Sequence, residues 1–267
     1  MPKETCKTIL KIMTGKEFVH FTPRCNRSIE IAMQVLKRLS RTTVLFQEEG
    51  GWLTYEKYIQ QAGLEPIKMI TDDGLVYEKE VSRYDMDAAL IINSLAGYVA
   101  LQDMDSLSGV CATHDVFLIN DVSGSIGLPQ GKVGDIVVGS FGKAKPVNLG
   151  SGGFIATNDK EIFDLIKELD PEEEDLPFTL LEKKLRTLEE RRTFLQQEAQ
   201  KIKDDLKDLN IVHPEHKGIN VIIRYEDDVQ KQKILSYCKE HDLEFTECPR
   251  MIRILDNAIS IEVKRLV

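Results

Sequence analysis

The sequence predicts an α/β protein with two parts: a large domain on a mostly parallel sheet and a smaller α+β domain behind it. Strand-like and helix-like segments alternate from about Thr43 to Ala156, which is typical of a parallel sheet covered by helices. A long amphipathic segment then runs from Phe178 to Leu209, and a mixed α+β tail follows. We therefore divide the chain into a large domain over residues 1–170, a connecting helix over 171–210 and a small domain over 211–267.

The large domain takes its predicted elements from apolar runs and from apolar residues at helical spacing. An amphipathic helix is expected from about Ile29 to Leu39, because its apolar residues recur every three or four positions. The expected strands are short apolar runs, and a glycine or polar loop separates each from the next helix. The strands are 43–46, 64–70, 88–93, 116–119, 136–138 and 154–156, and the later helices are 54–62, 101–112 and 159–169.

An acidic segment bounded by Pro171 and Pro177 separates these elements from the long helix. Leucines and other apolar residues of the helix follow a 4-3 spacing, which taken alone indicates a coiled-coil seam. The tail has a strand at 219–225, a helix at 227–241 and two alternating strands at 243–246 and 258–263. The alternation predicts strands with one solvated face.

Composition and charge exclude several classes of protein. At 267 residues, 42% apolar and 30% charged, the chain is an ordinary globular protein, and its net charge of −9 disfavours nucleic acid as a main partner. No apolar run approaches the ~20 residues of a membrane helix, and the first residues lack a signal-peptide core. Five cysteines without CxxC spacing indicate a reducing, cytoplasmic setting, and the five histidines show no metal-ligand spacing. We expect no metal.

The stretch from Ile119 to Asn158 carries the strongest chemical signal. Asp121 ends one predicted strand, Lys145 lies on a turn after a later strand, and Gly152-Gly153 precedes the next. A sheet can bring such a carboxylate and amine together. Pyridoxal phosphate (PLP) enzymes need this pair: the lysine forms a Schiff base with the cofactor aldehyde, and the aspartate keeps the pyridine nitrogen protonated.

This stretch resembles the fold-type I PLP enzymes, and most of all the DegT/StrS group of sugar aminotransferases. Asp121, Gly127, Ser140-Phe141, Lys145 and Gly152-Gly153 match the spacing of that group. Counted from Lys143 the register fails, so Lys145 is the preferred Schiff-base lysine and Lys143 the alternative. Two features depart from the group: Gly124 stands where a glutamine is usual, and the segment between Asp121 and Lys145 is short.

The resemblance also implies cofactor-binding residues elsewhere. Asn26 and Arg27, at the start of the first amphipathic helix, would bind the phosphate together with Ser140. Trp52 would stack on the cofactor ring, and Gly124 belongs to the same set by its position. In this family a long helix joins the two domains, which favours a packing role over a coiled coil for residues 178–209.

The resemblance implies a PLP-dependent aminotransferase that takes a small-molecule amino donor and acceptor and forms a homodimer. One alternative is a PLP-dependent lyase or a cysteine desulfurase, for which Cys248 in an expected loop would be the mobile cysteine. Another is a degenerate homologue that serves as an interaction subunit through its long helix. Arg224 and Arg253 are candidates for binding a substrate carboxylate.

Overall fold

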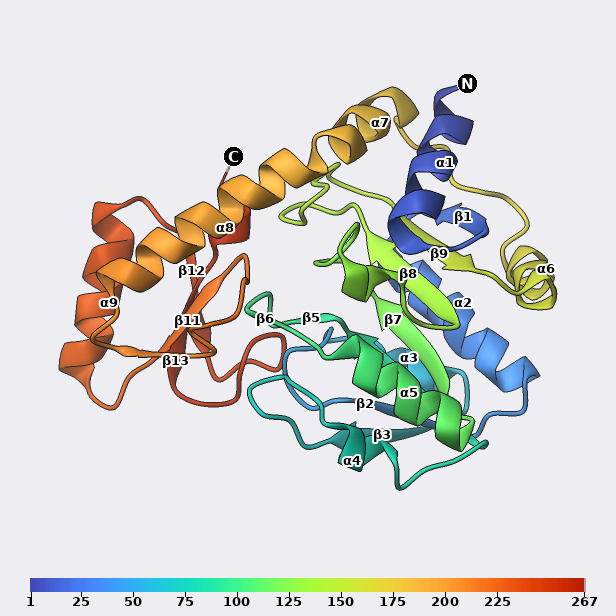
Figure 1. Ribbon diagram of the computed structural model, residues 1–267, viewed down its shortest axis with the longest axis horizontal. Coiled ribbons are helices and arrows are strands. Elements are labelled where there is room, and N and C mark those ends of the chain that lie inside the picture. The colour runs from blue at the N-terminus through green and yellow to red at the C-terminus, as the bar shows by residue number, and fades with distance from the viewer. Residues whose placement is uncertain (267) are drawn as a thin grey trace.

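The computed structural model describes residues 1–266, and its largest element is a seven-stranded sheet in the order β1-β9-β8-β7-β4-β2-β3 (Figure 1). Strand β9 runs antiparallel to both of its neighbours, and the other neighbouring pairs are parallel. The interior strand β4 is buried along its whole length, as expected for a strand covered on both faces. The seven strands are β1 (Phe18–Thr22), β2 (Thr43–Gln47), β3 (Glu65–Met69), β4 (Ala88–Asn93), β7 (Phe117–Asp121), β8 (Ile136–Ser140) and β9 (Gly153–Thr157).

Helices cover both faces of this sheet. One face packs against α2 (Cys25–Arg38), α3 (Tyr55–Gln61) and α6 (Lys160–Leu169). The opposite face packs against α1 (Pro2–Thr14) and α7 (Phe178–Arg186) near β1 and β9, and against α4 (Glu78–Val81) and α5 (Met104–His114) near β2 and β4. Two short segments, the hairpin β5 (Leu95–Ala96) with β6 (Ala100–Leu101) and the 3₁₀ turn η1 (Pro129–Lys132), lie in the loops.

The connection between the two parts of the chain is a pair of helices, whereas the sequence predicted one. Helix α7 ends at Arg186 and α8 (Leu188–Asp205) begins two residues later (Figure 1). The break falls at Thr187, whose hydroxyl donates to the carbonyl of Lys183 at 3.1 Å. A threonine that bonds back to the preceding turn bends a helix. The apolar residues of α8 pack on the small sheet, so the coiled-coil interpretation is not needed.

The small sheet is antiparallel throughout, in the order β10-β11-β13-β12. Helices α8 and α9 (Asp228–Glu240) cover it, and Leu95 and Tyr98 of the β5–β6 hairpin join its core. The large part of the chain thus inserts one loop into the small domain. The strands are β10 (Asn210–Ile211), β11 (Val221–Arg224), β12 (Phe245–Cys248) and β13 (Ala258–Ile261), followed by the 3₁₀ turn η2 (Val263–Arg265).

The predicted fold class is confirmed, although individual elements differ. Helix α1 was not expected; it buries Cys6 and Leu10 against Leu181 and Leu185 of α7. The domain boundaries at residues 170 and 210 stay predictions. Across residues 1–266, no helix combines the length and the apolar character needed to span a membrane.

Candidate functional site

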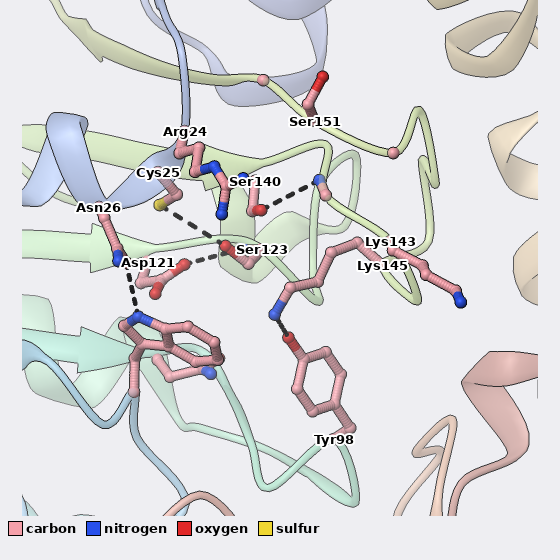
Figure 2. A pocket seen from close by; sticks show the side chains of 15 residues that line it. Arg24, Cys25, Asn26, Tyr98, Asp121, Ser123, Ser140, Lys143, Lys145 and Ser151 are labelled. Atoms are coloured by element: carbon pink, nitrogen blue, oxygen red, sulfur yellow. Dashed lines mark hydrogen bonds between the residues drawn. The ribbon is translucent and has the colours of Figure 1, made fainter. Parts of the chain in front are cut away.

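The carboxyl ends of the central strands meet at one edge of the large sheet. The register places Asn93 of β4 beside Asp121 of β7, and Ser140 of β8 beside Gly153 of β9. These ends, the loops after them and the start of α2 enclose a cavity of about 260 Å³ (Figure 2). Ligands bind at this edge in open α/β sheets. The cavity is therefore the candidate site.

Asp121 is held in place by two donors. The hydroxyl of Tyr55 donates to its Oδ2 at 2.7 Å, and the backbone N–H of Ser123 donates to its Oδ1 at 3.0 Å. Burial and the neighbouring Asp121 carboxylate raise the pKa of Tyr55 well above its ordinary value, so this hydroxyl stays neutral and able to donate. The carboxylate consequently faces the cavity in a fixed orientation.

Lys145 brings its amine into the same cavity. A turn from Gly142 to Asn148 presents it, with Ala144 in a left-handed conformation (φ 60°) and its N–H bonded to Asn148 at 3.2 Å. The amine donates to the hydroxyl of Tyr98 and lies 4.8 Å from the centroid of the Trp52 ring. Burial lowers the pKa of Lys145, but the Tyr98 hydroxyl and the Asp121 carboxylate outweigh it and leave the pKa raised.

Lys143 behaves differently. Its side chain is exposed at the rim of the cavity, and Figure 2 shows its amine pointing away from Asp121. The geometry therefore favours Lys145 over Lys143 as the amine that reacts inside the cavity.

Trp52 and Asn26, both predicted cofactor-binding residues, contact each other at the cavity wall. The indole N–H of Trp52 donates to Oδ1 of Asn26 at 2.7 Å. The bond ties the loop after β2 to the first turn of α2. Cys25 lies beside them, and burial together with the Asp121 carboxylate raises the pKa of its thiol well above the ordinary value, so it stays protonated.

The other end of the cavity suits an anion. Helix α2 begins here with no side-chain cap, and the N-terminus of a helix attracts an anion. Arg24 and Ser140 line the same end (Figure 2). Gly153 permits this arrangement, because a Cβ at that position would lie 2.5 Å from the backbone nitrogen of Cys25.

Two predicted cofactor-binding residues do not line the cavity. Arg27 points to the opposite side of α2, where it donates to Asp170 at 3.0 Å and to the carbonyl of Leu169 at 2.8 Å. Its side chain is thereby committed to holding the end of α6, and Arg24 takes the place at the cavity that we had expected for Arg27. Gly124 lies beneath the β5–β6 hairpin, where an added Cβ would lie 2.9 Å from Leu95.

The candidates for substrate binding and sulfur chemistry also lie elsewhere. Arg253 is buried and donates two hydrogen bonds to Glu262, at 2.8 and 2.7 Å. Arg224 pairs with Asp73 and Asp256. Cys248 is the last residue of β12, and burial raises the pKa of its thiol. Neither arginine is free to receive a carboxylate, and this cysteine is not on a mobile loop.

Sequence reasoning missed three residues of the site. Tyr55 contacts Asp121 and Tyr98 contacts Lys145, each from a segment far away in the sequence. No local sequence pattern predicts these contacts. Arg24 could have been found, because it directly precedes the first residue of α2. Within residues 1–266 no group of three or more His, Cys, Asp or Glu side chains is arranged to hold a metal ion.

Comparison with solved structures finds the same fold in several aminotransferases. A DegT/DnrJ/EryC1/StrS aminotransferase from Brucella abortus superposes with a TM-score of 0.76 at 16% identity, over 98% of this chain and 84% of that one. Helicobacter pylori PseC, an aminotransferase involved in the biosynthesis of pseudoaminic acid, gives 0.76 at 15% identity, over 98% and 85%. Serine palmitoyltransferase from S. paucimobilis, solved with a bound PLP–myriocin aldimine, gives 0.72 at 15% identity, over 97% and 71%.

Family models account for both parts of the chain. The model of the DegT/DnrJ/EryC1/StrS aminotransferase family matches residues 8–172, and that of the MJ1341 family C-terminal domain matches residues 190–267. The first match spans more than half of the chain and confirms the resemblance drawn from Asp121, Lys145 and the Gly152-Gly153 pair. The chain therefore belongs to the DegT/DnrJ/EryC1/StrS aminotransferase family, a family of PLP-dependent enzymes.

Proposed function

We propose that this protein is an aminotransferase that binds PLP in the cavity at the carboxyl edge of the large sheet and attaches it to Lys145. The observation that carries the proposal is the convergence of the Lys145 amine and the Asp121 carboxylate on one cavity, beside the Trp52 ring. An amine, a carboxylate and an aromatic face are the three groups that the reactive end and the ring of PLP require.

The residues present fit the cofactor at both ends. The start of α2, with Arg24 and Ser140, offers backbone N–H groups, a cation and a hydroxyl to the phosphate. At the other end, the fixed carboxylate of Asp121 would accept a hydrogen bond from the protonated ring nitrogen, and Trp52 would cover the ring. Arg27 and Gly124 are left out of the set, because neither reaches the cavity.

When bound, PLP supplies an electron-withdrawing ring that stabilises negative charge at the substrate's α-carbon. The protein's own residues would hold the cofactor and move the proton. Asp121, oriented by Tyr55 and Ser123, would keep the ring nitrogen protonated. The Lys145 amine would carry the proton to and from the substrate's α-carbon as a general base and acid.

The substrates are a small-molecule amino donor and an amino acceptor. We propose that the working unit is a homodimer with two-fold symmetry, because in the resembled family the cofactor lies between two chains. Light scattering that reports a monomer at all working concentrations would count against the dimer.

The site assignment is tested by borohydride reduction of the PLP-loaded protein followed by peptide mass spectrometry. We expect a pyridoxyl group on Lys145, present in Lys143→Ala and absent from Lys145→Ala. An adduct that survives in Lys145→Ala and disappears in Lys143→Ala would show that Lys143 is the lysine that binds PLP. If no variant forms an adduct and the protein stays colourless with PLP, the protein is a non-catalytic homologue that acts through its surface.

A further inference from the structure

Tyr98 stands between the reactive lysine and a buried charged cluster of the small domain. Its hydroxyl accepts a hydrogen bond from the Lys145 amine. The Lys264 amine lies 4.3 Å from the centroid of its ring, and the guanidinium carbon of Arg253 lies 5.4 Å away. One side chain of the large domain therefore links the cavity to two cations of the small domain.

The backbone of Tyr98 is held in an unfavourable conformation by the small domain. Its φ of 68° is rare for a bulky residue and needs support from the surrounding structure. The support comes from the backbone N–H groups of Ile219 and Asn220, which both donate to the Tyr98 carbonyl, at 2.8 and 3.1 Å. Gly218 permits that approach, since a Cβ there would lie 2.7 Å from the same oxygen.

The cations behind the ring form a fully buried group. Arg253 and Lys264 share the single carboxylate of Glu262, at 2.7 and 2.5 Å from Oε2, and all three side chains are less than one-tenth exposed. The electron-rich face of Tyr98 lies against the guanidinium of Arg253 and the amine of Lys264, an arrangement that favours a fixed ring position.

We propose that Tyr98 is the positioning residue for Lys145: its hydroxyl orients the amine and favours its charged form, and the Arg253–Glu262–Lys264 cluster fixes the ring that carries the hydroxyl. The inference rests on the proposed function in one respect, namely that Lys145 is the lysine that reacts. It assigns to the small domain a direct part in the chemistry of the large one.

The charged groups around Lys145 determine the direction in which its pKa should change when Tyr98 is altered. Tyr98 from the β5–β6 hairpin and Asp121 from β7 favour the ammonium form, and the thiol of Cys25 in α2, which stays protonated, lines the same cavity. Burial acts in the opposite sense, and Arg253, Glu262 and Lys264 lie beyond the Tyr98 ring as the charged groups of the small domain. Removing the Tyr98 hydroxyl, or displacing it from the amine, should therefore ease deprotonation of Lys145.

Carbamylation of the full-length protein by cyanate, without PLP, measures this directly. The lone pair of a neutral amine attacks the carbon of isocyanic acid, and the proton moves to its nitrogen, so that a urea forms without a leaving group. Peptide mass spectrometry against pH then yields a titration midpoint for Lys145, with exposed Lys143 as the internal reference. In Tyr98→Phe we expect the Lys145 midpoint to fall by about one pH unit, and in Gly218→Ala, where the added Cβ would displace the Tyr98 segment, we expect it to fall as well.

The matched control is Tyr237→Phe, which removes a tyrosine–carboxylate bond of 2.7 Å to Asp205 on the far side of the small domain. It should leave the Lys145 midpoint unchanged. A Tyr98→Phe protein with an unchanged midpoint and only a lower melting temperature would overturn the inference, and if that variant does not fold, an unchanged midpoint in Gly218→Ala does the same. Carbamylation needs no PLP, so a missing borohydride adduct would refute the proposed function and leave this result standing.

Discussion

The contact between Gly218 and the β5–β6 hairpin predicts that Gly218→Ala weakens the junction of the two domains. An added Cβ would lie 2.5 Å from the carbonyl oxygen of Val99 and 2.6 Å from its Cα. These are backbone atoms, which cannot swing aside as the end of a flexible side chain can. Relief requires the segment before β11 to move away from the hairpin, which stretches the bonds of Ile219 and Asn220 to the Tyr98 carbonyl.

The expected cost follows from those contacts. Overpacking of this kind costs about 1–3 kcal/mol, and two weakened backbone hydrogen bonds cost about 1 kcal/mol each. The stiffer unfolded chain returns about 0.4–1 kcal/mol. We therefore expect the free energy of unfolding to fall by about 2–4 kcal/mol, which lowers the urea midpoint by about 1 M for a chain of this size.

Fluorescence of the single tryptophan, Trp52, reports the transition, because the residue lies in the wall of the cavity. The matched control is Gly109→Ala in α5, where an added Cβ meets nothing within 4 Å. A glycine within a helix is unfavourable, so this control should gain about 0.5–1 kcal/mol. If Gly218→Ala unfolds at the same urea concentration as the unmodified protein, the close approach is not a constraint and the reasoning fails.

Three further predictions concern the cavity and the buried cluster. Arg24→Ala should weaken PLP binding about tenfold with little change in stability, whereas Arg27→Ala should lose about 1–2 kcal/mol of stability and bind PLP normally; equilibrium dialysis and urea denaturation separate the two, and reversed effects would restore Arg27 to the phosphate site. Asp121→Asn should keep the borohydride adduct but slow transamination about 10²-fold or more, because an amide cannot hold the ring nitrogen protonated; a normal rate in single-turnover assays would contradict this role. Burial and Arg253 lower the pKa of Lys264 to about 7, so between that pH and the ordinary lysine range the unfolded chain binds more protons and stability from this residue rises with pH. Lys264→Met should remove that rise, worth about 1.4 kcal/mol per unit of pKa difference, and parallel stability curves for the two proteins between pH 7 and 10 would refute it.

Local patterns predicted the large sheet and the edge of it at which Asp121 and Lys145 lie, for a physical reason. Buried parallel strands are short apolar runs, and parallel strands that neighbour each other must end at the same edge. Asp121 ends one such run and must therefore lie at that edge. Lys145 lies on a short turn after the adjacent strand β8. The spacing within residues 119–158 carries this information without any tertiary contact.

The residues that sequence reasoning misplaced depend on contacts between distant segments. The side to which Arg27 points is decided by Asp170, more than a hundred residues later, and its spacing from the helix start says nothing of that partner. The carboxylate partner of Arg253 is Glu262, which directly follows β13. The alternating pattern there predicted a strand with one solvated face, so a buried ion pair was not expected. The break at Thr187 comes with a bond from its side-chain hydroxyl to the Lys183 carbonyl, within a segment whose apolar spacing continues across the break.

The position of Tyr98 depends both on a residue within the family pattern, Gly124, and on contacts between distant segments. Its ring has room only because position 124 is a glycine, where a Cβ would lie 3.1 Å from Cε1 of Tyr98 and 2.9 Å from Leu95. The residue that departs from the family pattern at position 124 is thus tied to one that the pattern does not mention. Gly124 and Gly218 approach the Tyr98 segment from the large and small domains, and both leave space that any side chain would fill. Substitution at either should therefore shift the Lys145 carbamylation midpoint in the same direction as Tyr98→Phe, since each displaces the hydroxyl from the amine.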